Sequence, residues 1–310
     1  MSLARYAKKK QNSLRILLKE IVRKRVSYLF IAPFAIVFGL FVVAPVAVSI
    51  YYSFTYYNIL EKPVFVGFSN YINLLLNDDV FLQAVKNTFI MAAVTGPIGY
   101  MASFLFAWFI HELPRYLRAF AVLVFYAPSI SGSVFMIWSL LFSGDEYGYI
   151  NAVLMRLGIL DGPVLWLSDT KYMMTVVIIV ILWMSLGAGF LAFVAGLSTV
   201  DESLYEAGLV DGIKNRWQEL WYITLPSMKG MLMFGAVMSI TASFGVADVT
   251  TALCGSPSTD YAVHTVVNHL VDYGSVRFEM GYASAIATIL FLTMILCNKL
   301  IQKMLAKVGT

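Results

Sequence analysis

Charged side chains are scarce in this chain: Asp, Glu, Lys and Arg make up 13% of its 310 residues, whereas 60% are hydrophobic. The mean hydropathy is +0.77. A soluble domain carries roughly a quarter charged residues, so this composition excludes one. Long apolar runs predict instead a protein that crosses a membrane several times.

Residue types that commonly carry catalysis or bind metals are also few. The chain has three His and two Cys. Cys254 and Cys297 lie in different regions, so we expect no structural disulfide. The segment His111–Pro114 (HELP) lacks the second His of a zinc motif. The dipeptide Gly-Lys does not occur, which excludes a Walker A phosphate-binding loop. We therefore expect no catalytic residue, no metal and no cofactor on this chain.

Six apolar runs are long enough to cross a bilayer. They cover about residues 28–54, 84–110, 119–142, 172–197, 229–250 and 280–300. Proline and small polar residues in the third run are tolerated where a kinked backbone faces protein or a cavity. The predicted fold class is therefore an all-α polytopic membrane protein with six transmembrane helices.

Basic residues indicate the orientation of the spans. Residues 1–25 contain nine Lys and Arg, opposed only by Glu20. Directly before a span, such a segment is typical of a cytoplasmic orientation signal rather than of RNA binding, so we expect no nucleic-acid partner. With both termini in the cytoplasm, 17 of the 22 Lys and Arg residues lie on that side. We predict a multi-pass protein of the cell membrane, with a basic N-terminal segment (residues 1–26), a six-span domain (27–302) and a cytoplasmic tail (303–310).

The polar loop of residues 198–229, between spans four and five, has a helical pattern of its own. Ser198 followed by Asp201 reads as a capping box, which predicts a helix over about residues 200–210. Asp211–Gly212 is a turn signal, because glycine tolerates a positive φ. A second helix over residues 214–222 would place three apolar side chains on one face: Trp217, Leu220 and Trp221. The loop therefore predicts a helix-turn-helix at the membrane surface.

The sequence EAGLVDGIKNRWQELWYITLP in this loop resembles the cytoplasmic loop of binding-protein-dependent ABC importer permeases. The family pattern is Glu-Ala-Ala, three residues, Gly, nine residues, Ile-x-Leu-Pro. Here Gly208 replaces the second Ala, and ten residues separate Gly212 from Ile223. The resemblance implies that this loop couples the spans to an ATPase. The coupling residues it indicates are Glu206, Ala207, Gly208, Asp211, Gly212, Ile223, Leu225 and Pro226.

The resemblance continues from about Ser27 onwards and is to the carbohydrate-uptake branch, such as the maltose and glycerol-phosphate systems. It implies a sugar substrate, which we expect to be an oligosaccharide. It also implies four kinds of partner: a second permease subunit, with which we expect a heterodimer, a cytoplasmic ABC ATPase dimer that binds ATP and Mg, an extracellular substrate-binding protein and the lipid bilayer. Residues 253–257 read LCGSP where the family has Leu-Thr-Gly-Gly-Pro, so substrate contacts do not transfer directly.

Span five carries an unusual number of polar residues. Thr241, Phe244 or Gly245, and Asp248 recur at helical spacing, which predicts a shared face. An ionisable group in a span is costly unless it faces a cavity or a partner, so this face is a candidate substrate path. Aromatic rings with hydroxyl and carboxylate groups suit a sugar. The alternative is that Asp248 lies in water at the external end of the span.

Two other classes of membrane protein fit the sequence less well. A secondary carrier or channel usually has internal repeats and ionisable residues deep in several spans, and these spans are almost free of such residues. An intramembrane protease needs a Ser and a His, or paired Asp residues, within the bilayer. No His lies inside a predicted span. The carrier or channel is the alternative to the importer.

Overall fold

A computed structural model describes residues 23–132 and 134–305 of the chain. Most of the predicted basic segment 1–26, and residues 306–310 of the predicted tail, lie outside the described residues. The structure consists of two units, residues 1–52 and 53–310.

The first unit is one apolar helical segment. It comprises α2 (Arg25–Phe38), the π-helical turn η1 (Gly39–Val43) and α3 (Ala44–Tyr52). Together they form a candidate span of 28 residues with a mean hydropathy of 2.6. Large side chains such as Phe30 and Phe41 are exposed. A helix that is apolar on every side suits a membrane environment, and this one matches the first predicted span.

The second unit opens with a short antiparallel sheet of β1 (Thr55–Tyr56) and β2 (Val64–Phe65), in which Thr55 pairs with Phe65. Helix α4 (Ser69–Leu76) leads into α5 (Asp79–His111), a helix of 33 residues. The side chain of Asp78 accepts a hydrogen bond from the Phe81 amide and so caps the start of α5.

The fourth and fifth predicted spans each consist of two helices. The third predicted span also corresponds to two helices, which are bent against each other. The pairs are α6 (Arg115–Ile130) with α7 (Val134–Leu141), α9 (Thr170–Met184) with α10 (Ala188–Leu197), and α14 (Lys229–Phe244) with α15 (Asp248–Cys254). The last span is the unbroken α17 (Met280–Leu305), which extends beyond the predicted boundary at residue 302. Within the described ranges there are five candidate spans, or six if the bent α6–α7 pair is one span.

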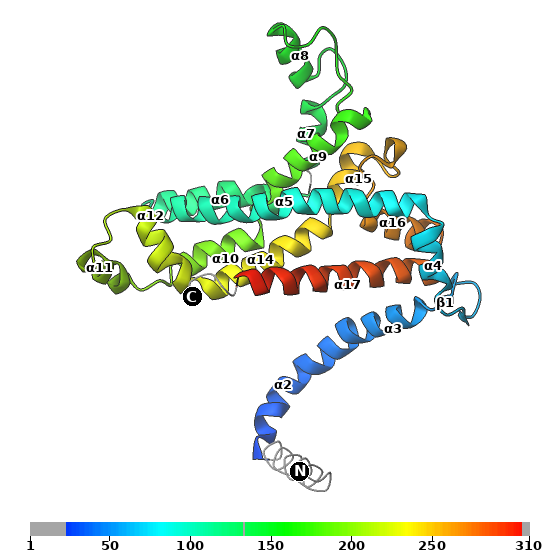
Figure 1. Cartoon of the computed structure of the whole chain (residues 1–310), viewed down its shortest axis with the longest axis horizontal. Coiled ribbons are helices and arrows are strands. Elements are labelled where there is room, and N and C mark those ends of the chain that lie inside the picture. The colour runs from blue at the N-terminus through cyan, green and yellow to red at the C-terminus, as the bar shows by residue number, and fades with distance from the viewer. Residues whose placement is uncertain (1–22, 133, 306–310) are drawn as a thin grey trace. The chain divides into compact units, whose positions relative to one another are not determined.

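The bundle is held together by close packing of α5, α10 and α14, with α17 against α14 (Figure 1). Small residues allow this approach. A Cβ placed on Gly189 of α10 would lie 3.6 Å from the carbonyl oxygen of Gly235 on α14. The ring of Phe193 lies directly over Gly235 and packs edge-on against Phe104 of α5. At Gly189 and Gly235 the backbones of α10 and α14 therefore approach each other closely.

The loop between α7 and α9 folds around one buried polar side chain, Asn151 of α8 (Tyr149–Arg156). Its amide donates to the carbonyls of Ser143, Asp145 and Val164. Its oxygen accepts from the Val164 amide and from the Trp166 indole, the latter at 2.7 Å. These bonds give an otherwise irregular loop a defined structure.

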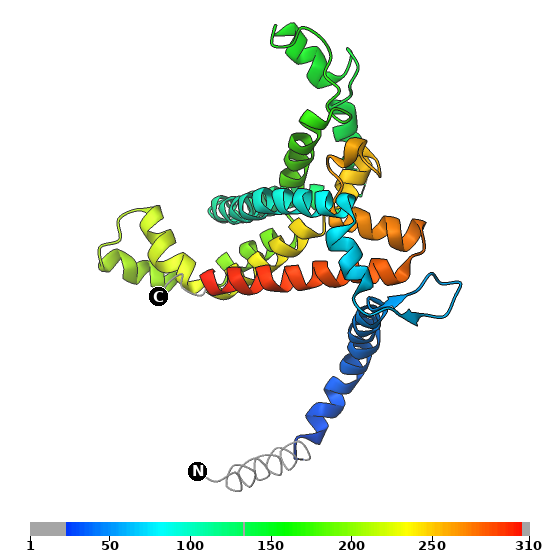
Figure 2. The ribbon, with the colours of Figure 1, turned by 45° about the vertical axis from the view of Figure 1, so that its right-hand side comes forward.

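The loop of residues 198–229 and the segments around α4 and α16 (Val266–Val271) lie at opposite ends of α5 (Figures 1 and 2). The buried clusters agree with this placement. Ile110, near the end of α5, shares a cluster with Leu220 of that loop. Phe81, near the start of α5, shares a cluster with Val266.

Candidate functional site: a helix-turn-helix between two spans

The first helix of the loop is α11 (Glu202–Val210), which begins two residues later than predicted. Its cap is Asp201, whose carboxylate accepts from the Ser203 amide at 3.0 Å. This hydrogen bond lowers the pKa of Asp201. The predicted capping box at Ser198 is wrong, because Ser198 ends α10 and its hydroxyl donates to the Val194 carbonyl.

Gly212 ends α11 in the geometry that only glycine adopts readily. Its φ is +92°. The Gly212 amide donates to Leu209 at 3.3 Å, and the Ile213 amide donates to Gly208 at 2.9 Å. This pair of bonds is a Schellman motif, in which a left-handed residue lets the chain reverse over the last helical turn. The predicted turn at Asp211–Gly212 is confirmed.

The second helix also begins later than predicted. It consists of α12 (Arg216–Glu219), the π-helical turn η2 (Leu220–Thr224) and α13 (Leu225–Ser227). Asn215 caps it by accepting from the Gln218 amide at 2.9 Å, so residue 214 lies outside the helix. Pro226 lies in α13, directly before α14.

The two helices of this hairpin close against each other through Gly208 and Ile223. Gly208 is buried, and a Cβ there would lie 2.7 Å from Cδ1 of Ile223 and 3.1 Å from Cδ1 of Ile213. The hydroxyls of Tyr205 and Thr224 are 2.9 Å apart and form a hydrogen bond between the two helices. Because glycine has no side chain, position 208 leaves room for the two isoleucine side chains that face it.

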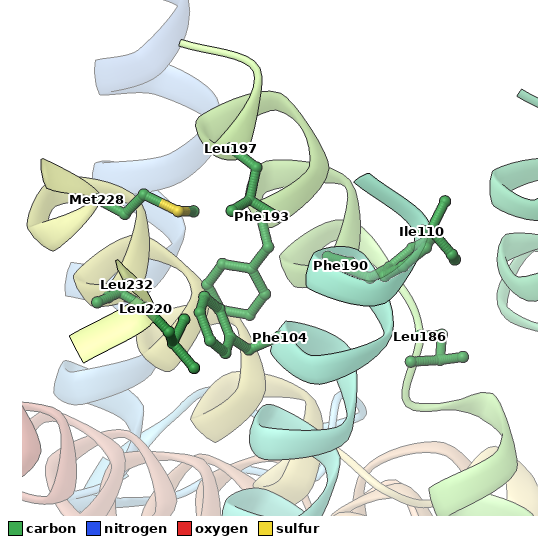
Figure 3. Packing of buried hydrophobic residues seen from close by; sticks show 10 residues of the cluster. Phe104, Ile110, Leu186, Phe190, Phe193, Leu197, Leu220, Met228 and Leu232 are labelled. Carbon is green, nitrogen blue, oxygen red and sulfur yellow. The ribbon is translucent and has the colours of Figure 1, made fainter. Parts of the chain in front are cut away.

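Leu220 ties this hairpin to the bundle. It is buried in a cluster with Phe104 of α5, Phe193 of α10 and Leu232 of α14 (Figure 3). A movement of the hairpin would therefore reach three spans through one packed contact, because close-packed side chains transmit displacement.

The predicted shared face of Trp217, Leu220 and Trp221 is wrong. Leu220 is buried, whereas Trp217 and Trp221 are 63% and 66% exposed. The helix begins at Arg216 and changes to π-helical geometry at Leu220, so a spacing of 3.6 residues per turn does not apply. The ring of Trp217 lies 5.2 Å from that of Trp108 on α5.

The outer face of the hairpin combines acidic and apolar groups. Among the predicted coupling residues, Glu206, Ala207 and Asp211 are exposed on α11 and at its end, while Leu225 and Pro226 are half-buried. Three exposed apolar residues that the sequence reasoning missed lie near them: Leu209, Val210 and Tyr222. Val210 is 87% exposed. Exposed apolar side chains beside a polar turn are typical of surfaces that contact another protein or a membrane.

Arg216 adds an electrostatic connection between the hairpin and α5. Its guanidinium lies 2.9 Å from Glu219 and 3.4 Å from Glu112, the residue that ends α5. The hydrogen bond to Glu219 raises the pKa of Arg216, with further stabilisation of its charge by Glu112. All three groups are partly solvated, so the pairs orient α12 more than they stabilise it.

A second candidate site lies where the spans are interrupted. The break between α9 and α10 (residues 185–187) and the break between α14 and α15 (245–247) border a cavity of about 230 Å³. Ser185, Ser239 and Ser243 supply hydroxyls to its lining, and Asp248 is the acidic group there. A neighbouring cavity of about 240 Å³ shares Ser185 and Ser239. Irregular backbone inside a membrane is tolerated where it lines such a cavity.

The structure does not bring Thr241, Phe244 and Asp248 together. Helix α14 ends at Phe244 and α15 begins at Asp248, so helical spacing does not continue between them. Asp248 is exposed and lines the 230 Å³ cavity, whereas Thr241 is exposed but is not among its lining residues. Phe244 is buried against Phe89 and lines a different, apolar cavity of about 400 Å³. Gly245, the alternative to Phe244, does line the 230 Å³ cavity with Asp248, but it lies in the break between the helices. The prediction that Thr241, Phe244 and Asp248 share a face is therefore wrong.

Known proteins resemble this chain over most of its length. A probable ABC transporter permease, YesP of Bacillus subtilis, is 31% identical over 85% of this chain and 84% of its own length. The arabinooligosaccharide transport permease AraP of the same organism is 29% identical, over 91% and 89%. Among solved structures, a bacterial alginate ABC transporter in complex with a pentasaccharide-bound periplasmic protein shares the fold. Its TM-score is 0.72 at 22% identity, over 95% of this chain and 99% of that one.

Residues 16–307 match the family of binding-protein-dependent transport system inner membrane components, a range that includes both the interrupted spans and the hairpin between them. This is the family that the pattern from Glu206 to Pro226 resembles. The chain belongs to that family of transport permeases.

Proposed function

We propose that this chain is the permease subunit of an ATP-driven importer that carries a sugar, specifically an oligosaccharide, into the cell. The observation that carries the proposal is the hairpin of residues 198–229. It is closed by its own hydrogen bonds, it presents an acidic and apolar outer face, and it is packed into three spans through Leu220. The chain contains no Gly-Lys dipeptide and thus no Walker A loop, so the ATP and Mg belong to a separate ATPase.

In this proposal the hairpin docks on a dimer of cytoplasmic ABC ATPase subunits. Glu206, Ala207 and Asp211 contact the ATPase directly, together with Leu209 and Val210. Gly208, Gly212 and Ile223 act indirectly by holding the hairpin closed. ATP-driven closure of the ATPase then displaces Leu220 and with it α5, α10 and α14.

The proposed topology has six spans, with the α6–α7 pair as the third and both termini in the cytoplasm. This topology puts the hairpin inside the cell and the α4 and α16 segments outside. The exposed apolar surface of Arg25–Tyr52 suits lipid and a second permease subunit. An extracellular substrate-binding protein delivers the sugar, and no nucleic-acid partner is involved.

The serine-lined cavity at the helix breaks is the proposed substrate path. Hydroxyl and carboxylate groups are the partners that sugar hydroxyls require. A permease for arabinooligosaccharides among the relatives supports a sugar as the substrate class. The alginate transporter supports the same overall fold.

Reconstitution tests the function directly. The tagged chain is purified in mild detergent from its native membrane, and the co-purifying subunits are identified by mass spectrometry. Proteoliposomes that contain this complex should take up a labelled oligosaccharide only with ATP on the ATPase side and the binding protein on the other. If the chain purifies alone and transports without ATP, it is a carrier and the proposal is wrong.

A further inference from the structure

Asp78 joins three elements at the end of the bundle opposite the hairpin. Besides the Phe81 amide of α5, its carboxylate accepts from the Tyr282 hydroxyl of α17 at 2.8 Å. The ring nitrogen Nε2 of His269, on α16, lies 3.0 Å from the same carboxylate. The start of α5 therefore holds α16 and α17 through one carboxylate.

A second buried histidine lies beside the first. The rings of His264 and His269 are 5.6 Å apart and nearly perpendicular. Their exposed fractions are 3% and 2%. Asn87 of α5 donates to the carbonyls of Tyr261 and His264, which anchors this segment to α5. Both rings are thus enclosed by helices rather than by solvent.

Each ring has a nitrogen without a hydrogen-bond partner within the described part of the chain: Nε2 of His264 and Nδ1 of His269. Both residues line a polar cavity of about 210 Å³ together with Asp78, Asp272 and Arg277. No group of three or more His, Cys, Asp or Glu among the described residues is placed to hold a metal ion. Both rings therefore border a polar cavity through which water could reach their unpartnered nitrogens.

The charged and titratable groups around the rings come from every element that packs against them. They are Asp78 before α5, Tyr261 of η3 (Thr259–Tyr261), Asp272 and Tyr273 of η4 (Asp272–Val276), Arg277 after it, and Glu279 and Tyr282 at the start of α17. Arg277 pairs with Asp272 at 2.8 Å and lies over the Tyr273 ring. Its charge is therefore largely compensated by Asp272.

Burial favours the neutral form of both rings. Burial, together with a smaller effect of the nearby His269, lowers the pKa of His264 to about 4, against the attraction of Asp272 and Asp78. Burial also lowers the pKa of His269, even though Asp78 acts in the opposite direction. At neutral pH the neutral His269 donates a hydrogen bond to Asp78, and the neutral His264 ring beside it carries no charge that would repel His269.

We propose that Asp78, His264 and His269 form an acid-sensitive latch, which holds α16 against the start of α5 while both histidines are neutral and releases it when they are protonated. Two imidazolium groups at this ring separation repel each other in a site with little water. That this latch responds to the external medium depends on the topology proposed above.

The direction and size of the effect follow from proton linkage. A released His264 has the ordinary pKa of 6.5, whereas the enclosed one has a pKa of about 4. Between these values the released state binds more protons, so the latch weakens as pH falls. From pH 7.5 to 5.5, His264 alone increases the equilibrium constant for opening about tenfold.

Hydrogen–deuterium exchange on the intact complex in nanodiscs tests the latch. Exchange of peptides spanning residues 262–271 is measured at pH 7.5 and 5.5 and corrected for the intrinsic exchange rate. Wild type should lose about tenfold in protection at pH 5.5. The double variant His264→Gln His269→Gln should show the same protection at both pH values. The matched control is His111→Gln, at the other end of α5, which should keep the wild-type response.

Equal protection of wild type at both pH values would overturn the latch, as would a double variant that responds like wild type. If the double variant is unprotected already at pH 7.5, His264→Gln replaces it, because that variant keeps the bond between His269 and Asp78. Its loss of protection should then be smaller than that of wild type, and an equal loss contradicts the proposal. Exchange is measured without transport, so ATP-dependent uptake at pH 7.5 tests the proposed function separately.

Discussion

Replacing Gly212 by Asp should uncouple this chain from its ATPase while leaving it inserted in the membrane. At a φ of +92°, an L-residue other than glycine is strained. The cost is roughly 1–2 kcal/mol. No atom lies within 4 Å of a Cβ placed there, so the effect is one of backbone strain and added charge rather than a clash.

That strain opposes the Schellman turn and therefore the closed hairpin. A cost of 1–2 kcal/mol lowers the population of the closed form relative to open forms by about 5- to 30-fold. Because only the closed form binds, we expect the affinity of the ATPase for the permease to fall by up to the same factor. It is measured by titrating the ATPase onto nanodisc-embedded permease, with sugar uptake as a second readout.

Two variants serve as controls for this prediction. Gly212→Asn should fall between wild type and Asp, because Asn tolerates left-handed backbone better than other residues and carries no charge. Gly230→Ala should be neutral, because Gly230 lies in the first turn of α14 and a Cβ there meets nothing within 4 Å. Wild-type affinity and uptake by Gly212→Asp, at equal membrane abundance, would refute the reasoning.

Three further predictions concern other parts of the molecule. Gly208→Ala should reduce uptake, since its Cβ would lie 2.7 Å from Cδ1 of Ile223; adding Ile223→Val, which removes that methyl, should restore part of the loss, and no restoration argues against this contact. Asp248→Ala should raise the sugar concentration for half-maximal uptake more than it changes basal ATP hydrolysis; if neither changes, Asp248 is a solvated helix end. Asn151→Ala should leave buried carbonyls unpaired, at about 1–3 kcal/mol, and speed trypsin cleavage at Arg156; an unchanged cleavage rate contradicts this role of the asparagine.

Hydropathy predicted where the helices lie, because an apolar run long enough to cross a bilayer has few alternatives. It did not predict the interruptions at residues 185–187 and 245–247. Glycine occurs at both breaks, but glycine also serves close helix packing, as at Gly189, and the sequence does not distinguish the two uses. Because the helix is interrupted after Phe244, Phe244 and Asp248 do not share a helical face.

The hairpin was predicted better than the substrate path, because its turn depends on local chemistry. The left-handed glycine at position 212 is a local requirement and was identified from sequence. The cap was assigned to Ser198 incorrectly, because that side chain bonds the preceding helix instead. The hydrogen bond between Asp78 and His269 joins residues 191 positions apart, and no local sequence pattern predicts such a contact.

Site-specific photo-crosslinking from Val210 shows whether the hairpin contacts a separate ATPase, as proposed. A photoreactive residue is placed at position 210 and, as a matched control, at Ile159, which is also exposed but lies in the loop around α8. After irradiation of native membranes, mass spectrometry should identify an adduct with an ABC ATPase from position 210 and none from position 159. An adduct from both positions, or from neither when the chain is folded and active in uptake, would contradict the account.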